Sequence, residues 1–331
     1  MQGCFWSAAV PRRAGCQEGA NGVKCAWLLG PRGRCVEGMA LRRFKVALAQ
    51  MSPALGDLER NLALHEKLAR EAASHGAGLV LFPELSLTGY FIKDLVSSVA
   101  LRAESPELRP LLVLSRDVAL VVGLVEETPD RRFYNAALYL EGGAVRHVHR
   151  KVYLPTYGIF DEQRYFAAGD RARAFDTALG RMAILLCEDL WHPALPLLAA
   201  HDGADLILCP SSSPGRGLGP EGRFCNAAAW EAANRTYAAL FTVYLAYAGR
   251  VGYEDGACFW GGSEVIGPGG EPAAKAPYLD EVLLYAELDP NELRRARIAN
   301  PLLRDERLEL TLRELGELVR RRSGGSPPSH G

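Results

Sequence analysis

Three residues with the chemistry for acyl transfer each stand where a predicted strand ends. Glu84 follows LVLFP, Lys151 follows VRHVHR, and Cys187 follows MAILL. The ends of strands are where sheet folds present reactive groups to a ligand. Together the three residues could supply a general base, a cation and a nucleophilic thiol, which are the groups needed to cleave an amide through a thioester.

Each residue also has an ordinary explanation when it is taken alone. Cys187 could be an inert buried thiol, Lys151 a solvated cation at a strand end, and Glu84 a carboxylate that caps a backbone amide or pairs with an arginine. Two carboxylates, Glu188 and Asp189, follow Cys187 directly. A turn with two carboxylates is an unexpected place for an inert core residue, which favours the chemical explanation.

The surroundings of Glu84 suit a base. It is the only charge in an apolar run and stands behind Pro83. Desolvation by such neighbours raises the proton affinity of a carboxylate, as removal of a thiol proton requires. Lys151 is expected to remain an ammonium that stabilises the thiolate and an oxyanion, with the backbone N–H after Cys187 as a second oxyanion donor.

The elements that must position these residues alternate between strands and helices. Apolar periodicity predicts helices at 58–74, 92–116, 193–202 and 224–240. It predicts strands at 46–51, 79–82, 118–127, 135–143, 145–154, 181–189, 205–212 and 242–252, and a last pair at 262–271 and 282–288. Buried strands that alternate with helices predict an α/β fold in which helices cover a sheet. The segments GAGLVLFPE and GADLILCPS also resemble each other, which predicts two matching halves that meet at one seam.

Composition narrows the class of protein. The chain has 331 residues, of which 48% are hydrophobic and 23% charged, and its net charge is −1. It therefore has no field to attract nucleic acid or acidic lipid, and a small molecule is the expected partner. No run of about 18 apolar residues and no signal-peptide pattern is present, which predicts a cytoplasmic protein without a membrane anchor.

The spacing of the eight cysteines and the composition of the two chain ends give two further expectations. No cysteines form a C-x-x-C pair, so neither a zinc site nor a redox motif is predicted. Residues 1–38 are expected to be a disordered extension or a misplaced start, 39–312 a catalytic domain, and 313–331 the end of a C-terminal helix with a polar tail.

The three motifs in this order resemble the nitrilase superfamily of carbon-nitrogen hydrolases, and within it the glutaminase domain of glutamine-dependent NAD synthetases. FPELSLTGY, HRKVYLPTYGIFDEQRYF and LLCEDLWHP carry the resemblance, which covers about residues 43–290. It implies a nitrilase-type α-β-β-α sandwich, in which two sheets are flanked by helices. It also implies a Glu84–Lys151–Cys187 triad, with Glu162 as a second glutamate that orients it.

The resemblance further implies which residues hold the substrate. Those with counterparts in the glutaminase domains are Tyr90, Tyr157, Phe160, Glu188, Ser213 and Arg216. An arginine and a glutamate together could receive the carboxylate and ammonium of an amino acid. The sequence departs from the family at FIKDL after Tyr90 and at Gly249, where many members have asparagine.

These features predict a thiol amidohydrolase that releases ammonia from a glutamine-like ω-amide without a cofactor. The synthetases' Ser-Gly-Gly-x-Asp-Ser loop is not found, so an alternative is a glutaminase subunit that supplies ammonia to a separate NAD synthetase. N-carbamoyl amines are a further substrate class, and a non-enzymatic binding subunit is the least favoured prediction. The alternating His147 and His149 are assigned structural or surface roles and not a metal site. The resemblance also implies a homodimer or larger homo-oligomer, with the helix at 225–240 as a candidate contact.

Overall fold

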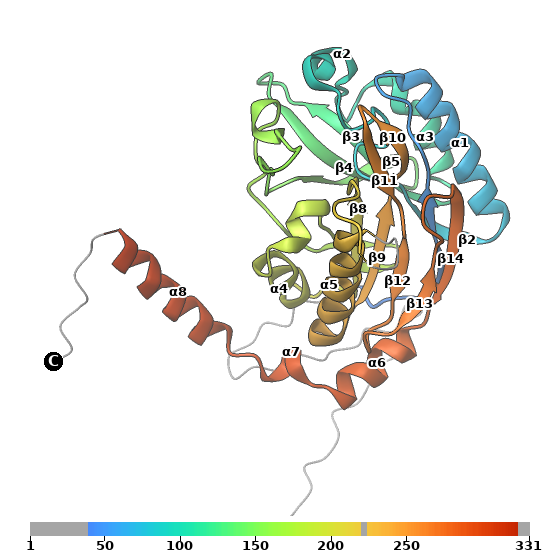
Figure 1. Ribbon diagram of the computed structural model, residues 1–331. Coiled ribbons are helices and arrows are strands. Elements are labelled where there is room, and N and C mark those ends of the chain that lie inside the picture. Colours follow the sequence, from blue (N-terminus) through green and yellow to red (C-terminus); the bar gives the residue numbers. More distant parts are fainter. Residues whose placement is uncertain (1–38, 220–223, 324–331) are drawn as a thin grey trace, which may run out of the picture. The chain divides into compact units, whose positions relative to one another are not determined.

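The computed structural model describes residues 39–219 and 224–323 of the chain (Figure 1). Two six-stranded mixed sheets pack against each other, and helices cover the outer face of each sheet. The predicted α-β-β-α sandwich is therefore confirmed. The predicted extension at 1–38 and the tail at 324–331 lie outside the described residues.

The first sheet contains the strand that precedes Glu84 and the strand that precedes Lys151. β1, β2 and β3 run parallel at its centre, and the remaining pairs are antiparallel. In spatial order the strands are β14 (Val282–Leu288), β1 (Phe44–Gln50), β2 (Ala77–Leu81), β3 (Ala119–Glu127), β4 (Phe133–Glu141) and β5 (Ala144–Arg150). The central strands read as continuous apolar runs because both of their faces are buried.

The second sheet contains the strand that precedes Cys187. β7, β8 and β9 run parallel at its centre. In spatial order the strands are β13 (Pro272–Lys275), β12 (Glu264–Ile266), β9 (Tyr244–Gly249), β8 (Leu206–Ser211), β7 (Gly180–Ile184) and β6 (Phe175–Thr177). A separate hairpin pairs β10 (Val251–Glu254) with β11 (Ala257–Trp260).

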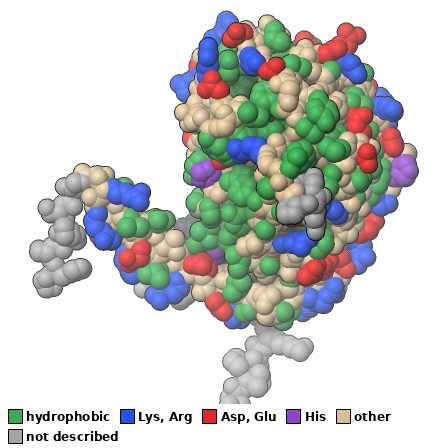
Figure 2. Space-filling model, viewed as in Figure 1, with side chains coloured by type: hydrophobic (Ala, Val, Ile, Leu, Met, Phe, Trp, Pro, Cys, Tyr) green, Lys and Arg blue, Asp and Glu red, His purple; other side chains and the backbone are tan. Residues whose placement is uncertain are grey.

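The helices cover the two outer faces. Buried alanines and leucines of α1 and α3 pack on the first sheet, and those of α4 and α5 pack with Trp230 on the second. The helices are α1 (Leu58–Ser74), α2 (Val96–Val99), α3 (Arg109–Leu114), α4 (Ala194–His201), α5 (Cys225–Phe241), α6 (Pro290–Ala299), α7 (Leu302–Asp305) and α8 (Leu308–Arg322). Figure 2 shows hydrophobic side chains at the surface in the region of α4 and α5, where Trp191, Leu198 and Leu240 are exposed.

Several predicted elements differ from the structure. The strand predicted at 242–252 is divided between β9 and β10, and the strand predicted at 181–189 ends at Ile184. The helix predicted at 92–116 is divided into short helices, because the backbone of Leu101 leaves the helical conformation to pair with β3 through Val125 and Glu127. The last two predicted strands do not pair with each other. The part of 262–271 that forms β12 lies in the second sheet, whereas β14 pairs with β1 in the first.

The predicted domain boundary between residues 312 and 313 falls inside α8. No residue of that helix is buried, although it is amphipathic in sequence. None of the helices in the described residues is both long enough and apolar enough to cross a membrane.

Candidate active site

Glu84 lies in a tight turn after β2 and is fully buried. The turn lies directly against β3 at Gly123. A Cβ atom at that position would stand 2.4 Å from the carbonyl oxygen of Pro83 and 2.5 Å from the backbone nitrogen of Leu85. Glycine is therefore required in the middle of this strand, because any side chain would push the Glu84 turn away.

The carboxylate of Glu84 accepts three hydrogen bonds from groups that are distant in sequence. Oε1 accepts from Lys151 Nζ at 2.7 Å and from Asn135 Nδ2 at 2.8 Å, and Oε2 accepts from the backbone N–H of Ser212 at 2.8 Å. An ionised carboxylate has the lone pairs to accept all three. The side chain is thus held in one orientation by two sheets.

Lys151 is the first residue after β5, and its ammonium bridges two carboxylates. Nζ donates to Glu84 at 2.7 Å and to Glu162 at 2.7 Å. Burial lowers the pKa of Lys151, but the two carboxylates outweigh it and raise the pKa well above its usual range. These contacts favour the charged ammonium form of Lys151.

Glu162 opens the short 3₁₀ helix η3 (Glu162–Arg164) and is also buried. It accepts a hydrogen bond from the hydroxyl of Tyr90 as well as from Lys151. Burial raises the pKa of Glu162 to about 7, with Glu84 adding to this and Lys151 opposing it. A cavity of about 130 Å³ lies beside Tyr90 and Glu162.

Cys187 begins the 3₁₀ helix η4 (Cys187–Trp191) with a left-handed backbone conformation, φ +44°. Non-glycine residues adopt this region at a cost, and such residues gather at functional sites. Ser211 Oγ donates to its sulfur at 3.2 Å. Burial and Glu84 raise the pKa of the thiol well above its usual range, although Lys151 and Ser211 oppose this. The resting thiol is therefore protonated and needs a base.

Asp189 holds the Cys187 turn to the segment that follows Lys151. Its carboxylate accepts from the backbone N–H groups of Val152 and Tyr153 at 2.9 Å each, from Leu186 N–H at 3.1 Å and from His149 Nε2 at 2.8 Å. Sequence reasoning noticed the carboxylate but did not assign this role. The only signal was its position two residues after the cysteine.

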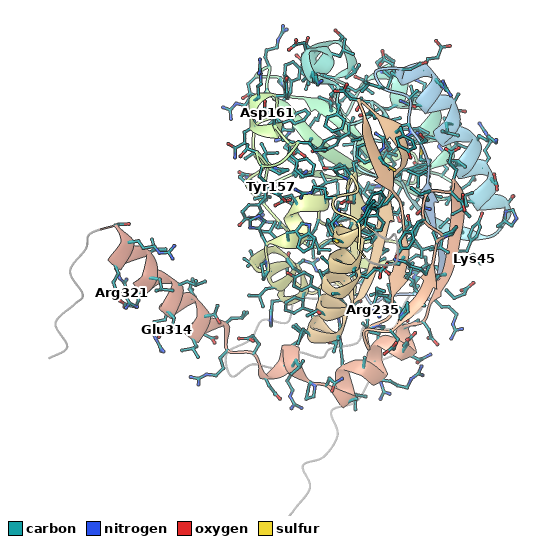
Figure 3. All side chains as sticks on the ribbon, in the orientation of Figure 1. Lys45, Tyr157, Asp161, Arg235, Glu314 and Arg321 are labelled. Carbon is teal, nitrogen blue, oxygen red and sulfur yellow. The ribbon has the colours of Figure 1, made fainter. Side chains whose placement is uncertain are left out.

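Four of the six predicted substrate-binding residues lie together. Tyr157 donates a hydrogen bond to Glu188 at 2.8 Å, and the guanidinium of Arg216 stands over the rings of Tyr157 and Phe160 at 5.1 and 5.3 Å. Figure 3 labels Tyr157 and Asp161 on the segment after β5, which supplies Tyr157 and Phe160 to this group, whereas Glu188 lies in the 3₁₀ helix Cys187–Trp191 and Arg216 follows β8. The cluster contains one cation, Arg216, and one carboxylate, Glu188, which directly follows Cys187 in the sequence.

The other two predicted substrate residues have different contacts. Tyr90 is buried and donates to Glu162. The hydroxyl oxygen of Ser213 accepts from Trp230 Nε1 at 3.0 Å and from Asn226 Nδ2 at 3.2 Å, so this side chain faces α5. Within the predicted serine run, Ser211 and Ser212 are the residues that contact Cys187 and Glu84.

The two alternating histidines have separate structural contacts. His149 is buried against Asp189, and His147 stacks on Phe175 with ring centroids 4.0 Å apart. Within residues 39–219 and 224–323 there is no group of three or more His, Cys, Asp or Glu side chains that could hold a metal ion.

Comparison with known proteins assigns the chain to a protein family. The model of the carbon-nitrogen hydrolase family matches residues 45–298. A glutamine-dependent NAD(+) synthetase of Acinetobacter baylyi is 32% identical over 261 residues, which are 78% of this chain and 46% of the synthetase. The chain thus spans about half the length of that relative.

Two further relatives are covered over most of their length. The chloroplastic omega-amidase of Arabidopsis thaliana is 30% identical over 285 residues, which are 82% of this chain and 74% of the amidase. The crystal structure of a carbon-nitrogen hydrolase from Helicobacter pylori superposes with a TM-score of 0.75 at 26% identity, over 83% of this chain and 99% of that one.

Proposed function

Because this chain belongs to the carbon-nitrogen hydrolase family of the nitrilase superfamily and is an amidase-type enzyme, we propose that it hydrolyses a glutamine-like ω-amide through a thioester on Cys187. The observation that carries the proposal is the buried Glu84–Lys151–Glu162 network beside a strained, buried cysteine. This arrangement supplies a base, a fixed positive charge and a nucleophile in one place.

In the acylation step, the sulfur of Cys187 attacks the carboxamide carbon while Glu84 takes the thiol proton. Lys151 and the backbone N–H of Glu188 stabilise the oxyanion that forms. Glu84 then passes its proton to the departing nitrogen, the C–N bond breaks, and ammonia leaves. The product of this step is a thioester on Cys187 with Glu84 again ionised.

In the deacylation step, Glu84 takes a proton from a water molecule whose oxygen attacks the thioester carbon. The C–S bond breaks, and the proton held by Glu84 returns to the sulfur. The products are a carboxylic acid and the free thiol of Cys187. Glu84 serves first as base and then as acid in both the acylation step and the deacylation step. Its rigid placement by three hydrogen-bond donors is consistent with this role.

The cluster of Tyr157, Phe160, Glu188 and Arg216 supports an amino acid or a similar zwitterion as the part of the substrate remote from the reacting amide. A guanidinium matches a carboxylate, and a carboxylate matches an ammonium. The similarity to an omega-amidase over 74% of that protein supports a free-standing amidase. The similarity to glutamine-dependent synthetases supports the alternative of a glutaminase that supplies ammonia to a separate synthetase.

We also propose that two copies of this chain associate through α5. Its small side chains Ala228 and Ala232 are exposed in the single chain, which would allow a second copy to approach closely. Sedimentation of the wild type and of Ala232→Arg tests this. A monomeric wild type, or an Ala232→Arg variant that keeps the wild-type mass, would exclude α5 as the contact.

Ammonia release from glutamine, asparagine, other ω-amides, N-carbamoyl amines and simple nitriles tests the proposed activity. We expect ω-amides to be hydrolysed by the wild type, and Cys187→Ala to lose at least about a thousandfold of that rate. The exposed thiol of Cys225 provides the matched control, because Cys225→Ala should retain full activity. Activity that survives in Cys187→Ala would refute the thioester mechanism.

A further inference from the structure

Arg250 and Glu254 form a buried ion pair outside the proposed triad. The guanidinium Nη1 donates to Glu254 Oε2 at 2.6 Å, and the two side chains are 1% and 3% exposed. Arg250 lies between β9 and β10, and Glu254 is the last residue of β10. None of the motifs that identify the triad includes either residue.

The other oxygen of Glu254 holds the backbone of the segment that carries Tyr90. Oε1 accepts from the backbone N–H of Tyr90 at 2.8 Å and from the N–H of Phe91. Gly89 allows this approach, since a Cβ there would stand 2.8 Å from Glu254 Oε2 and 2.9 Å from Leu55 Cα. The Tyr90 segment is therefore fastened to one carboxylate.

Tyr90 connects that carboxylate to the triad. Its hydroxyl donates to Glu162, Glu162 accepts from Lys151, and Lys151 donates to Glu84. The backbone N–H of Arg250 also donates to the carbonyl of Ser211 at 3.1 Å, and Ser211 is the residue that contacts the Cys187 sulfur.

Stability is a poor explanation for the Arg250–Glu254 pair. Within the described residues, Nε and Nη2 of Arg250 have no hydrogen-bond partner, although the guanidinium also stands 4.2 Å from the ring centroid of Phe259. Desolvation of two charges commonly costs as much as their attraction returns, and unpaired donors add to that cost. The structural role of the Arg250–Glu254 pair is therefore to hold the backbone of the Tyr90 segment in position.

We propose that Glu254, the partner of Arg250, is a positioning residue that sets the reach of the Tyr90 hydroxyl to Glu162 and so keeps Lys151 between its two carboxylates. Neither residue touches the reacting atoms. The inference rests on the proposed role of Cys187 as the nucleophile, and it predicts that the length of the Glu254 side chain matters more than its charge.

Two variants separate length from charge. Glu254→Asp keeps the charge but shortens the reach to the two N–H groups. Arg250→Met combined with Glu254→Gln removes both charges but keeps an amide oxygen at the same reach, and removal of both partners of a buried pair is tolerated better than removal of one. Thermal melting confirms that each variant is folded before it is assayed.

The readout is the rate of Cys187 alkylation by iodoacetamide across pH, followed by mass spectrometry, together with ammonia release. Glu254→Asp should slow alkylation at pH 7 at least about fivefold and move its midpoint to higher pH, whereas the double variant should stay within about twofold of wild type. Tyr90→Phe should shift the midpoint in the same direction, and adding Glu254→Asp to it should have little further effect. The groups that face the Cys187 thiol and act on its pKa are Glu84, Lys151, Ser211 and Cys209.

Two outcomes would overturn the inference. One is an alkylation profile of Glu254→Asp that matches the wild type, and the other is a double variant as impaired as Glu254→Asp. If Glu254→Asp does not fold, Tyr90→Phe carries the test, and an alkylation profile of Tyr90→Phe that matches the wild type would also overturn the inference. Alkylation does not depend on the substrate, so a wild type that releases no ammonia would count against the proposed function and not against this inference.

Discussion

Glu84 and Ser212 exchange two hydrogen bonds across 128 positions of sequence. The backbone N–H of Ser212 donates to the Glu84 carboxylate at 2.8 Å, and the Ser212 hydroxyl donates to the Glu84 carbonyl at 2.8 Å. The two residues end, or directly follow, the similar segments GAGLVLFPE and GADLILCPS. The two sheets therefore meet at these segments, and the second sheet fixes the proposed base that the first sheet carries.

Gly123→Ala should impair the site although residue 123 contacts no substrate. The added methyl would collide with the backbone of the Glu84 turn, so we expect a loss of about 1–3 kcal/mol in stability and a fall of about a hundredfold in kcat/KM. Gly269→Ala is the matched control, because nothing lies within 4 Å of its Cβ position. Chemical denaturation and ammonia release measure both effects, and equal behaviour of the two variants would contradict the prediction.

Ser211→Ala should weaken the nucleophile. The Ser211 hydroxyl lowers the pKa of Cys187 by donating to its sulfur, so its removal should raise that pKa further and slow alkylation at pH 7 several-fold. Ser213→Ala serves as the comparison, since that hydroxyl accepts from Trp230 and Asn226 instead. Should Ser213→Ala slow alkylation and Ser211→Ala leave it unchanged, the assignment of the two serines is wrong.

Glu162 should govern the acid side of the pH–activity profile. Its pKa is raised to about 7, so it gains a proton as pH falls through that value and its charge no longer holds Lys151. We expect kcat/KM of the wild type to fall below about pH 7. In Glu162→Gln the maximal rate should be lower, and the fall of kcat/KM below about pH 7 should be absent. If kcat/KM of the variant falls at the same pH as that of the wild type, another group is responsible for the fall.

Asp189→Asn should be strongly destabilising. The carboxylate of Asp189 accepts hydrogen bonds from four donors. The amide of asparagine can accept through one oxygen only, so its NH₂ group would face donors that have lost their acceptor. We expect a loss of about 1–3 kcal/mol in the free energy of unfolding for each buried N–H group that is left without an acceptor. Asp305→Asn removes an exposed ion pair with Arg304 that solvent already screens, so its free energy of unfolding should stay close to that of the wild type. Comparable losses in urea denaturation would argue against the assigned role of Asp189.

His65 should make the fold sensitive to acid. Burial lowers its pKa to about 4, although its hydrogen bond to the carbonyl of Asn61 acts in the opposite direction. The unfolded chain binds a proton near pH 6.5, so the stability contributed by neutral His65 is present above that pH and is lost as pH falls toward 4. The difference in unfolding free energy between wild type and His65→Gln should therefore shrink by up to about 3 kcal/mol between pH 7.5 and 4. A constant difference would show that His65 does not titrate in this way.

Local sequence pattern predicted most of the elements and the reactive residues. The predicted helix at 58–74 has the observed bounds of α1, because its apolar residues recur at the helical period, although Asn61 and His65 are buried with them. Glu84, Lys151 and Cys187 were identifiable because each reactive side chain follows a strand whose pattern marks it as buried, and their order along the chain is that of a known family.

Only the tertiary structure decided which groups surround those residues. Asn135, Ser211, Ser212 and Asp189 acquire their roles from strands that pair across long stretches of sequence, and the requirement for Gly123 arises from the turn that packs on it. The pairing of β14 with β1 could not be predicted from local pattern either, because the two strands lie over 230 residues apart. A local pattern records whether a residue is buried, whereas the choice of its neighbours depends on how separate elements pack, and that choice sets the hydrogen bonds and pKa values on which the proposed chemistry depends.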